Sequence, residues 1–232
     1  MNLKNNLFNY ATSELSQDAF LCWLASYALE DAEPDDTLRS CAREMLELFV
    51  PEFNGRPFTL TDVERQVWHI DALLTAELAG TTYKIIVEDK TYTREHSEQL
   101  MRYKEEIQTK FPGCIPCGVY YKTGFQSDLS AVHKAKYQYV SLEKMLDLLG
   151  RYVEKTGNQI FRDYYGYWKT PSATGSFLRQ SGTAPNAPAF SMRCKTGTFC
   201  RGATARSATA MWPTKREGSR GFGCGRRLAT LM

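Results

Sequence analysis

Residues 69–90, HIDALLTAELAGTTYKIIVEDK, decide the fold of this chain. Two runs rich in β-branched, aromatic and aliphatic residues, Val63–Leu78 and Tyr83–Val87, flank Gly80-Thr81-Thr82. Apolar runs of this kind favour strands, and a Gly-Thr-Thr segment between them suits a turn. The stretch therefore predicts a meander of two or three strands.

Helical patterns lie on both sides of the meander. Before it, apolar residues at helical spacing predict a helix from about residue 11 to Leu29, with Thr12 or Ser13 as N-cap, and a second helix from Thr37 to Phe49. After it, the pattern predicts a helix over 95–110, a strand over 115–122, a strand over 137–140, and helices over 141–149 and 158–168. This order indicates an α/β fold with a mixed central β-sheet flanked by helices.

The charge and composition change at residue 171. Residues 1–170 carry 19 Lys and Arg against 25 Asp and Glu, whereas residues 171–232 carry 10 against 1. The second segment has no Ile or Val and few Leu, so it cannot readily build a core. We expect one domain over 1–170. The basic low-complexity tail over 171–232 is expected to be disordered or an out-of-frame product; a basic arm for nucleic acid is the alternative.

The sequence also bears on the compartment. No apolar run approaches the roughly 18 residues of a membrane span, and the first residues lack the pattern of a secretory signal. Seven scattered cysteines, an odd number, do not suggest a disulfide framework, and Cys114 and Cys117 are interpreted as two buried thiols. We therefore expect a cytoplasmic protein with reduced cysteines and no membrane partner.

Charged residues at the strand ends carry the candidate chemistry. Asp71 lies within an otherwise apolar strand, and Glu88, Asp89 and Lys90 end the next one. Side chains alternate along a strand, so Glu88 and Lys90 point to one side and Asp89 to the other. Because the strands of a meander run antiparallel, Asp71 and Glu88 can lie side by side at one end of the sheet.

Two facing carboxylates repel each other unless a cation lies between them, and hard ions such as Mg²⁺ or Mn²⁺ prefer oxygen ligands. An ion held by Asp71 and Glu88 could polarise a phosphoryl oxygen and lower the pKa of a bound water. Lys90 could orient that water or neutralise charge that develops on the phosphorus. The three residues suffice, in outline, for phosphodiester hydrolysis.

This pattern resembles the signature of the PD-(D/E)XK nuclease superfamily, with Asp71 followed by Glu88-Asp89-Lys90 as Glu-x-Lys. Ile70 stands where the family name has Pro, a variation that leaves the acid in place. The phrase at 11–20, ATSELSQDAF, also resembles the opening of a bacterial subgroup of this superfamily, and the likeness extends over about residues 5–168.

Further residues join the resemblance. Glu14 matches an acid that many members place in the first helix, and Gln99 with Tyr103 resembles the Gln-x-x-x-Tyr motif that follows the lysine in one branch. Residues four apart share a helix face, so Gln99 and Tyr103 could both reach the site. The resemblance implies that Glu14 and the backbone carbonyl of Asp89 add metal ligands.

The resemblance also implies a restriction-endonuclease-like core and a Mg²⁺- or Mn²⁺-dependent enzyme that cuts DNA in restriction, defence or repair. RNA as substrate and the oligomeric state, a dimer included, stay open at this point. So does an alternative function, a catalytically silent nuclease fold that serves as a nucleic-acid-binding or interaction module. A second alternative treats Asp71, Glu88 and Lys90 as structural ion pairs whose carboxylates point apart.

Three neighbouring features have open interpretations. His69 is either a structural partner or a residue that shares the face of Asp71. Asp18, one turn after Glu14, is either a second acid of the site or a charge on the solvent side of its helix. Alternation between core and surface explains Tyr120, Tyr121 and Lys122 as well as contact with nucleic acid does.

Overall fold

A computed structural model describes residues 5–11, 14–91 and 98–170, which belong to one compact unit of the chain. Its centre is a sheet in the order β1-β2-β3-β4-β5. The strands are β1 (Phe58–Val67), β2 (Ile70–Leu78), β3 (Thr81–Lys90), β4 (Ile115–Lys122) and β5 (Tyr137–Ser141). The pairs β1–β2 and β2–β3 are antiparallel, whereas β3–β4 and β4–β5 are parallel. The sheet is therefore mixed, as the sequence predicts.

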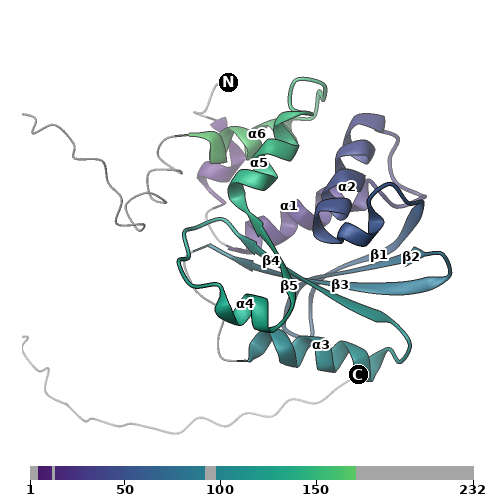
Figure 1. The fold of residues 1–232 in the computed structure, drawn as a ribbon. Coiled ribbons are helices and arrows are strands. Elements are labelled where there is room, and N and C mark those ends of the chain that lie inside the picture. Colours follow the sequence, from purple (N-terminus) through teal and green to yellow (C-terminus); the bar gives the residue numbers. More distant parts are fainter. Residues whose placement is uncertain (1–4, 12–13, 92–97, 171–232) are drawn as a thin grey trace, which may run out of the picture. The chain divides into compact units, whose positions relative to one another are not determined.

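Helices cover both faces of this sheet (Figure 1). One face packs against α1 (Glu14–Ser26), α2 (Asp36–Phe49), α5 (Leu142–Gly150) and α6 (Gln159–Lys169). The other face packs against α3 (Gln99–Lys110) and α4 (Ser130–Lys134). Short 3₁₀ helices, η2 (Leu7–Asn9) and η3 (Pro51–Phe53), precede α1 and follow α2. This is an α/β fold with a five-stranded mixed sheet flanked by helices.

The central strand β3 shows how the two layers share the sheet. Ile85 and Val87 belong to the larger core under α1 and α2, and Ile86 belongs to the smaller core under α3. All three are buried, because alternate side chains of a strand enter opposite layers. Polar side chains further along this strand are therefore also buried, on one face of the sheet or the other.

Local signals predicted several elements well. The strand over 115–122 has the predicted bounds, and α5 and α6 begin after side-chain caps from Ser141 and Asn158. The helix α2 begins one residue earlier than predicted, because Asp35 caps it. Residues 12–13, the expected cap of the first helix, and residues 95–97 of the third lie outside the described residues, as does the tail over 171–232.

The meander differs from the prediction in its turns. The predicted continuous stretch over 63–78 is two strands, joined at Trp68–His69, and the next turn is Ala79–Gly80 rather than Gly80–Thr82. Neither Trp nor His is common in tight turns, so nothing in the local sequence indicated the first turn. The short helix α4 was also missed.

This topology brings the candidate residues to one end of the sheet. The parallel strands β3 and β4 end there together, with Lys90 paired to Lys122, and the antiparallel strand β2 begins there. Within the described ranges, no helix has both the length and the apolar character that a membrane span requires.

Candidate active site

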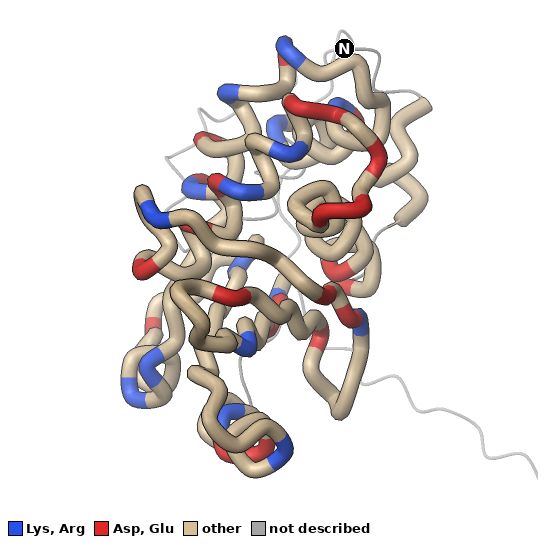
Figure 2. Tube along the Cα trace, turned by 90° about the vertical axis from the view of Figure 1, so that its right-hand side faces the viewer, with Lys and Arg blue, Asp and Glu red and all other residues tan. Residues whose placement is uncertain are grey.

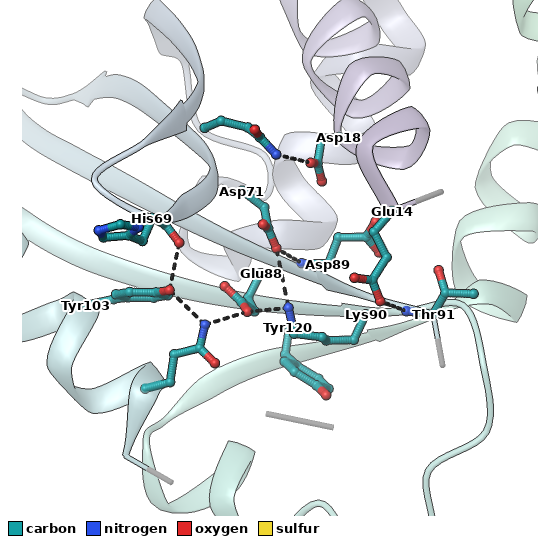
Figure 3. Close-up of polar contacts among 12 residues, drawn as sticks. Glu14, Asp18, His69, Asp71, Glu88, Asp89, Lys90, Thr91, Tyr103 and Tyr120 are labelled. Atoms are coloured by element: carbon teal, nitrogen blue, oxygen red, sulfur yellow. Dashed lines mark hydrogen bonds and ion pairs between the residues drawn. The ribbon is translucent and has the colours of Figure 1, made fainter. Parts of the chain in front are cut away.

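Asp71, Glu88 and Lys90 meet at this end of the sheet, on the face covered by α3 (Figure 3). The Nζ of Lys90 lies 2.6 Å from Oε1 of Glu88 and 3.7 Å from Oδ2 of Asp71. The two carboxylates thus converge on one ammonium group. The alternative of a purely structural cluster expected carboxylates that point apart, which is not the arrangement found.

Asp71 is held where the strands β2 and β3 separate. Their ladder ends at the pair Ala72 and Val87, one position before Asp71 and Glu88 would pair. Oδ2 of Asp71 instead accepts a hydrogen bond of 2.9 Å from the backbone N–H of Asp89. The Asp71 side chain thus accepts a backbone hydrogen bond from β3 beyond the last pair of the ladder. This bond fixes the carboxylate beside Glu88.

The helix α3 holds Glu88 through a chain of hydrogen bonds. Nε2 of Gln99 donates to Oε1 of Glu88 at 2.9 Å and to the hydroxyl of Tyr103 at 2.7 Å. The Tyr103 hydroxyl donates to the backbone carbonyl of His69 at 2.6 Å. Gln99 and Tyr103 therefore lie at the site, as their spacing predicts, and they connect it to the turn between β1 and β2.

Glu14 reaches the site from the opposite layer. It is the first residue of α1, and its Oε1 accepts a hydrogen bond of 2.9 Å from the backbone N–H of Thr91, directly after Lys90. The bond fixes the start of α1 against the end of β3 (Figure 3). The negative charge of Glu14 helps to raise the pKa of both Asp71 and Lys90.

Burial dominates the electrostatics of the three central residues. Burial, and then nearby Asp71, raises the pKa of Glu88 to about 7 against the opposing effect of Lys90. Burial also raises the pKa of Asp71, against the opposing effect of Lys90. Burial alone would lower the pKa of Lys90, but Glu88 and Asp71 outweigh it, so the pKa is raised. Lys90 is therefore firmly protonated, whereas Glu88 carries its charge at a cost.

One oxygen of the site lacks a partner. Glu88 is fully buried, and its Oε2 has no hydrogen-bond partner among the described residues. A buried carboxylate oxygen without a donor is unfavourable and suggests a ligand that is not protein. The donor set of Asp71 and Glu88 consists of hard oxygens, which suits Mg²⁺ or Mn²⁺.

A closed metal cage is not the arrangement found. In the described part of the chain, no three His, Cys, Asp or Glu side chains gather closely enough to enclose an ion. Mg²⁺ keeps several waters and is usually bound by one or two carboxylates together with substrate phosphates. The pair Asp71 and Glu88 fits such an open site, and Glu14 is held by Thr91 at its edge.

Asp89 lies on the opposite face, as strand alternation predicts, but its surroundings were not foreseen. It is fully buried, and neither of its carboxyl oxygens has a hydrogen-bond partner among the described residues. Burial, and then the neighbouring Asp18, raises its pKa well above the usual value. The raised pKa favours the neutral form of the Asp89 side chain, and the contact of Asp89 with the candidate site is made by its backbone N–H, which donates to Asp71.

Asp18 is buried on the same side of the sheet, at 1% exposure. The interpretation as a charge on the solvent side is therefore wrong. Its Oδ2 accepts a hydrogen bond of 3.3 Å from Gln66, and burial, then Asp71, raises its pKa to about 7. The sequence could not reveal the proximity of Asp18 to Asp89, because it depends on how α1 packs against the sheet.

The residues of β4 beside the site are all buried. Tyr120 and Tyr121 are fully covered, and Lys122 is 1% exposed. Alternation between core and surface is thus wrong for this strand, because helices cover both faces. The Nζ of Lys122 donates to the backbone carbonyl of Thr91 at 3.1 Å, which joins the ends of β3 and β4.

Other candidates lie apart from the site. Cys114 and Cys117 are free thiols; Cys114 is buried, as predicted, whereas Cys117 is only half-buried, and desolvation of its thiol raises the pKa of Cys117 to about 11. A cavity of about 590 Å³ lies between α2 and α5, lined by residues that include Glu44, Lys144 and Arg151. It contains none of the candidate site residues. This cavity is therefore separate from the candidate site.

Comparison of the chain with protein-family models, curated proteins and solved structures finds no match. Asp71, Glu88 and Lys90, together with the side chains that hold them, are therefore the features of this chain that indicate a function.

Proposed function

We propose that this protein is a Mg²⁺- or Mn²⁺-dependent nuclease that hydrolyses phosphodiester bonds in DNA, built on a restriction-endonuclease-like core of the PD-(D/E)XK type. One observation carries the proposal. Asp71 and Glu88 converge on Lys90 where two adjacent strands separate, and Glu88 keeps a buried oxygen without a protein partner. A structural ion pair needs one carboxylate for one ammonium, whereas here there are two.

The residues have distinct roles in this proposal. Asp71 and Glu88 hold the metal through carboxylate oxygens, and the backbone carbonyl of Asp89 is a further ligand. The N–H and C=O of a residue in an extended strand point toward the same neighbour. The Asp89 N–H is directed to Asp71. Its carbonyl is therefore directed to the same side. When bound, the ion would polarise the phosphoryl oxygens and acidify a water.

Lys90 supplies the positive charge of the protein at the reacting phosphate. An ammonium group has three N–H donors; one donates to Oε1 of Glu88 at 2.6 Å, whereas Asp71 lies at 3.7 Å, an ion-pair distance. A remaining N–H can donate to the attacking water or to a phosphate oxygen, where it stabilises the charge that develops as the bond to phosphorus forms. Because the pKa of Lys90 is raised, this proton stays on Nζ at neutral pH.

Gln99, Tyr103 and Glu14 position these groups. The amide of Gln99 fixes Oε1 of Glu88, and Tyr103 fixes Gln99. The bond from Thr91 fixes Glu14 at the end of α1, where its carboxylate contributes to the negative field around Lys90. Pre-set polar groups of this kind lower the barrier because they need no reorganisation during the reaction.

The charge of the chain favours metal dependence over simple phosphate binding. Residues 1–170 carry 25 acidic against 19 basic residues, and the two kinds are interspersed along the trace (Figure 2). Tight binding of nucleic acid without metal normally rests on many Lys and Arg contacts. We therefore expect affinity for nucleic acid to depend on the divalent cation.

The test uses the purified full chain with single-stranded DNA, duplex DNA and RNA, each with Mg²⁺, Mn²⁺ or EDTA. We expect cleavage of DNA with either ion, none in EDTA, and a loss of at least about 100-fold in Lys90→Ala. Lys84→Ala is the matched control. Lys84 is also buried on β3, and its Nζ donates to Oγ1 of Thr75 at 2.8 Å, at the other end of the strand.

Three outcomes separate the functions. Cleavage that Lys90→Ala abolishes and Lys84→Ala retains supports the nuclease. Binding of DNA with Mg²⁺ but no cleavage under any condition indicates the silent binding module. Cleavage that survives in Lys90→Ala at the wild-type rate contradicts the proposed site and indicates a contaminating nuclease.

A further inference from the structure

The turn that joins β1 to β2 has an unusual backbone for its residues. Val67 pairs with Ile70, so Trp68 and His69 alone form the turn, and their φ angles are +50° and +66°. Two-residue hairpin turns with positive φ at both positions strongly prefer Asn-Gly or similar pairs. The bulky Trp68 is strained there, whereas histidine is among the residues that adopt positive φ more readily, and backbone strain of this kind concentrates at functional sites.

Contacts from α3 hold this turn in place. The hydroxyl of Tyr103 donates to the His69 carbonyl at 2.6 Å, the Trp68 ring lies 5.6 Å from the Phe111 ring, and Nζ of Lys110 lies 4.6 Å from the centre of the Trp68 ring. The backbone of the turn is thus fixed by the same hydrogen-bonded chain that holds Glu88. Its position relative to the candidate site is set by the fold.

The ring of His69 is not part of this support. His69 is exposed, and within the described residues its imidazole has no hydrogen bond or ion pair, since its only hydrogen bond is accepted by the backbone carbonyl. The residue precedes Asp71 by two positions; in Figure 3 its carbonyl faces Tyr103, whereas its ring points away from Asp71 and Glu88. The turn therefore presents an unused N–H donor at the same end of the sheet, on the far side of Tyr103 from the carboxylates.

We propose that His69 is a substrate-binding residue, whose ring donates a hydrogen bond to a phosphate of the DNA strand beside the bond that is cut. This inference rests on the proposed function, because it assumes that DNA lies across Asp71 and Glu88. This role would account for the strained turn, because the turn places the imidazole of His69 at this end of the sheet. An Asn-Gly turn would join the two strands with less strain but would present no imidazole.

The chain contains a matched control turn. Ala79 and Gly80 join β2 to β3 at the far end of the same strand, with φ angles of +51° and +77°. This turn also has a residue other than glycine at positive φ, but it lies at the opposite end of β2 from Asp71. Ala79→Asn relieves the backbone there without touching the candidate site.

The experiment measures binding and stability in the full chain that carries Lys90→Ala, so that DNA is not cut. The probe is a fluorescently labelled DNA oligonucleotide, single-stranded or duplex, with Mg²⁺. We expect His69→Gly to weaken affinity about tenfold, the loss of a hydrogen bond to a charged group, while the Tm stays equal or rises by on the order of 3 °C. His69→Arg, which keeps a donor, should bind within about threefold of the parent.

The control variant completes the test. Ala79→Asn should leave affinity unchanged and give a Tm that is equal or higher. Affinity that His69→Gly leaves at the parental value, or a protein that binds no DNA at all, overturns the inference. Wild-type protein that binds DNA through His69 yet cuts none overturns the proposed nuclease and leaves the phosphate contact standing.

Discussion

Glu88→Gln offers the most direct measurement of what the site costs the fold. The substitution keeps the shape of the side chain and an oxygen that can accept from Gln99, but it removes the negative charge. We expect the variant to be more stable than the wild type at pH 8 in EDTA. A buried carboxylate with a raised pKa is destabilising in its charged form, and the amide resembles its protonated form.

The magnitude follows from the pKa of Glu88. Burial raises it from 4.5 to about 7, so between these values the folded protein binds this proton more tightly than the unfolded chain does. The free energy of unfolding therefore falls as the pH rises through this window. A difference of about 2.5 pKa units corresponds to about 3 kcal/mol above pH 7. For a protein of this size, that is a Tm higher by about 6–12 °C in Glu88→Gln.

The assay is thermal and urea unfolding of both proteins in EDTA at pH 8 and near pH 4.5. The difference should be full at pH 8 and small near pH 4.5, where Glu88 is protonated in the folded protein and half protonated in the unfolded chain. Glu77→Gln is the matched control, because Glu77 is an exposed acid on the neighbouring strand β2 and should change the Tm little at either pH. A Glu88→Gln variant less stable than the wild type at pH 8 would refute this reasoning, since the ion pair with Lys90 would then outweigh burial.

Three further predictions follow from the same contacts. Mg²⁺ at pH 8 should raise the Tm of the wild type, in proportion to the logarithm of its concentration above saturation, and should not raise that of Asp71→Asn; an equal rise in both contradicts the metal site. Tyr103→Phe removes the bond to the His69 carbonyl and should lower the free energy of unfolding by about 1 kcal/mol while slowing cleavage, as urea unfolding and initial rates would show. Gly118→Ala should destabilise by about 2 kcal/mol or more, because a Cβ there would lie 2.4 Å from the buried ring of Tyr137; an unchanged unfolding midpoint would contradict this packing.

Elements with local signals were predictable from the sequence. The strand β4 and the helices α5 and α6 follow from apolar runs and from caps at Ser141 and Asn158, which act within a few residues of themselves. The turn at Trp68–His69 was not predictable, because nothing local favours positive φ in those residues. Contacts from α3, about 35 residues further along the chain, hold it in place.

The candidate site was likewise predictable from the sequence only in part. Strand alternation was enough to place Asp71, Glu88 and Lys90 together, since it requires only the period of a strand and an antiparallel neighbour. The buried pair of Asp18 and Asp89 depends on α1 lying across the back of the sheet, so no local pattern could reveal it. The sequence therefore predicted the face that carries Asp71, Glu88 and Lys90 and missed the acids on the opposite face.

The charge balance at this end of the sheet favours a functional cluster over a structural one. Among the described residues, Lys90 is the one ammonium group that approaches both Asp71 and Glu88, and their pKa values are raised in its presence. Had the cluster been a stabilising ion pair, Lys90 would hold the pKa of its partners below the usual values. A second positive charge at this place would reverse the balance, and the divalent cation of the proposed function would supply it. The sign of the stability change in Glu88→Gln, measured with and without Mg²⁺, therefore tests the nature of the site before any substrate is known.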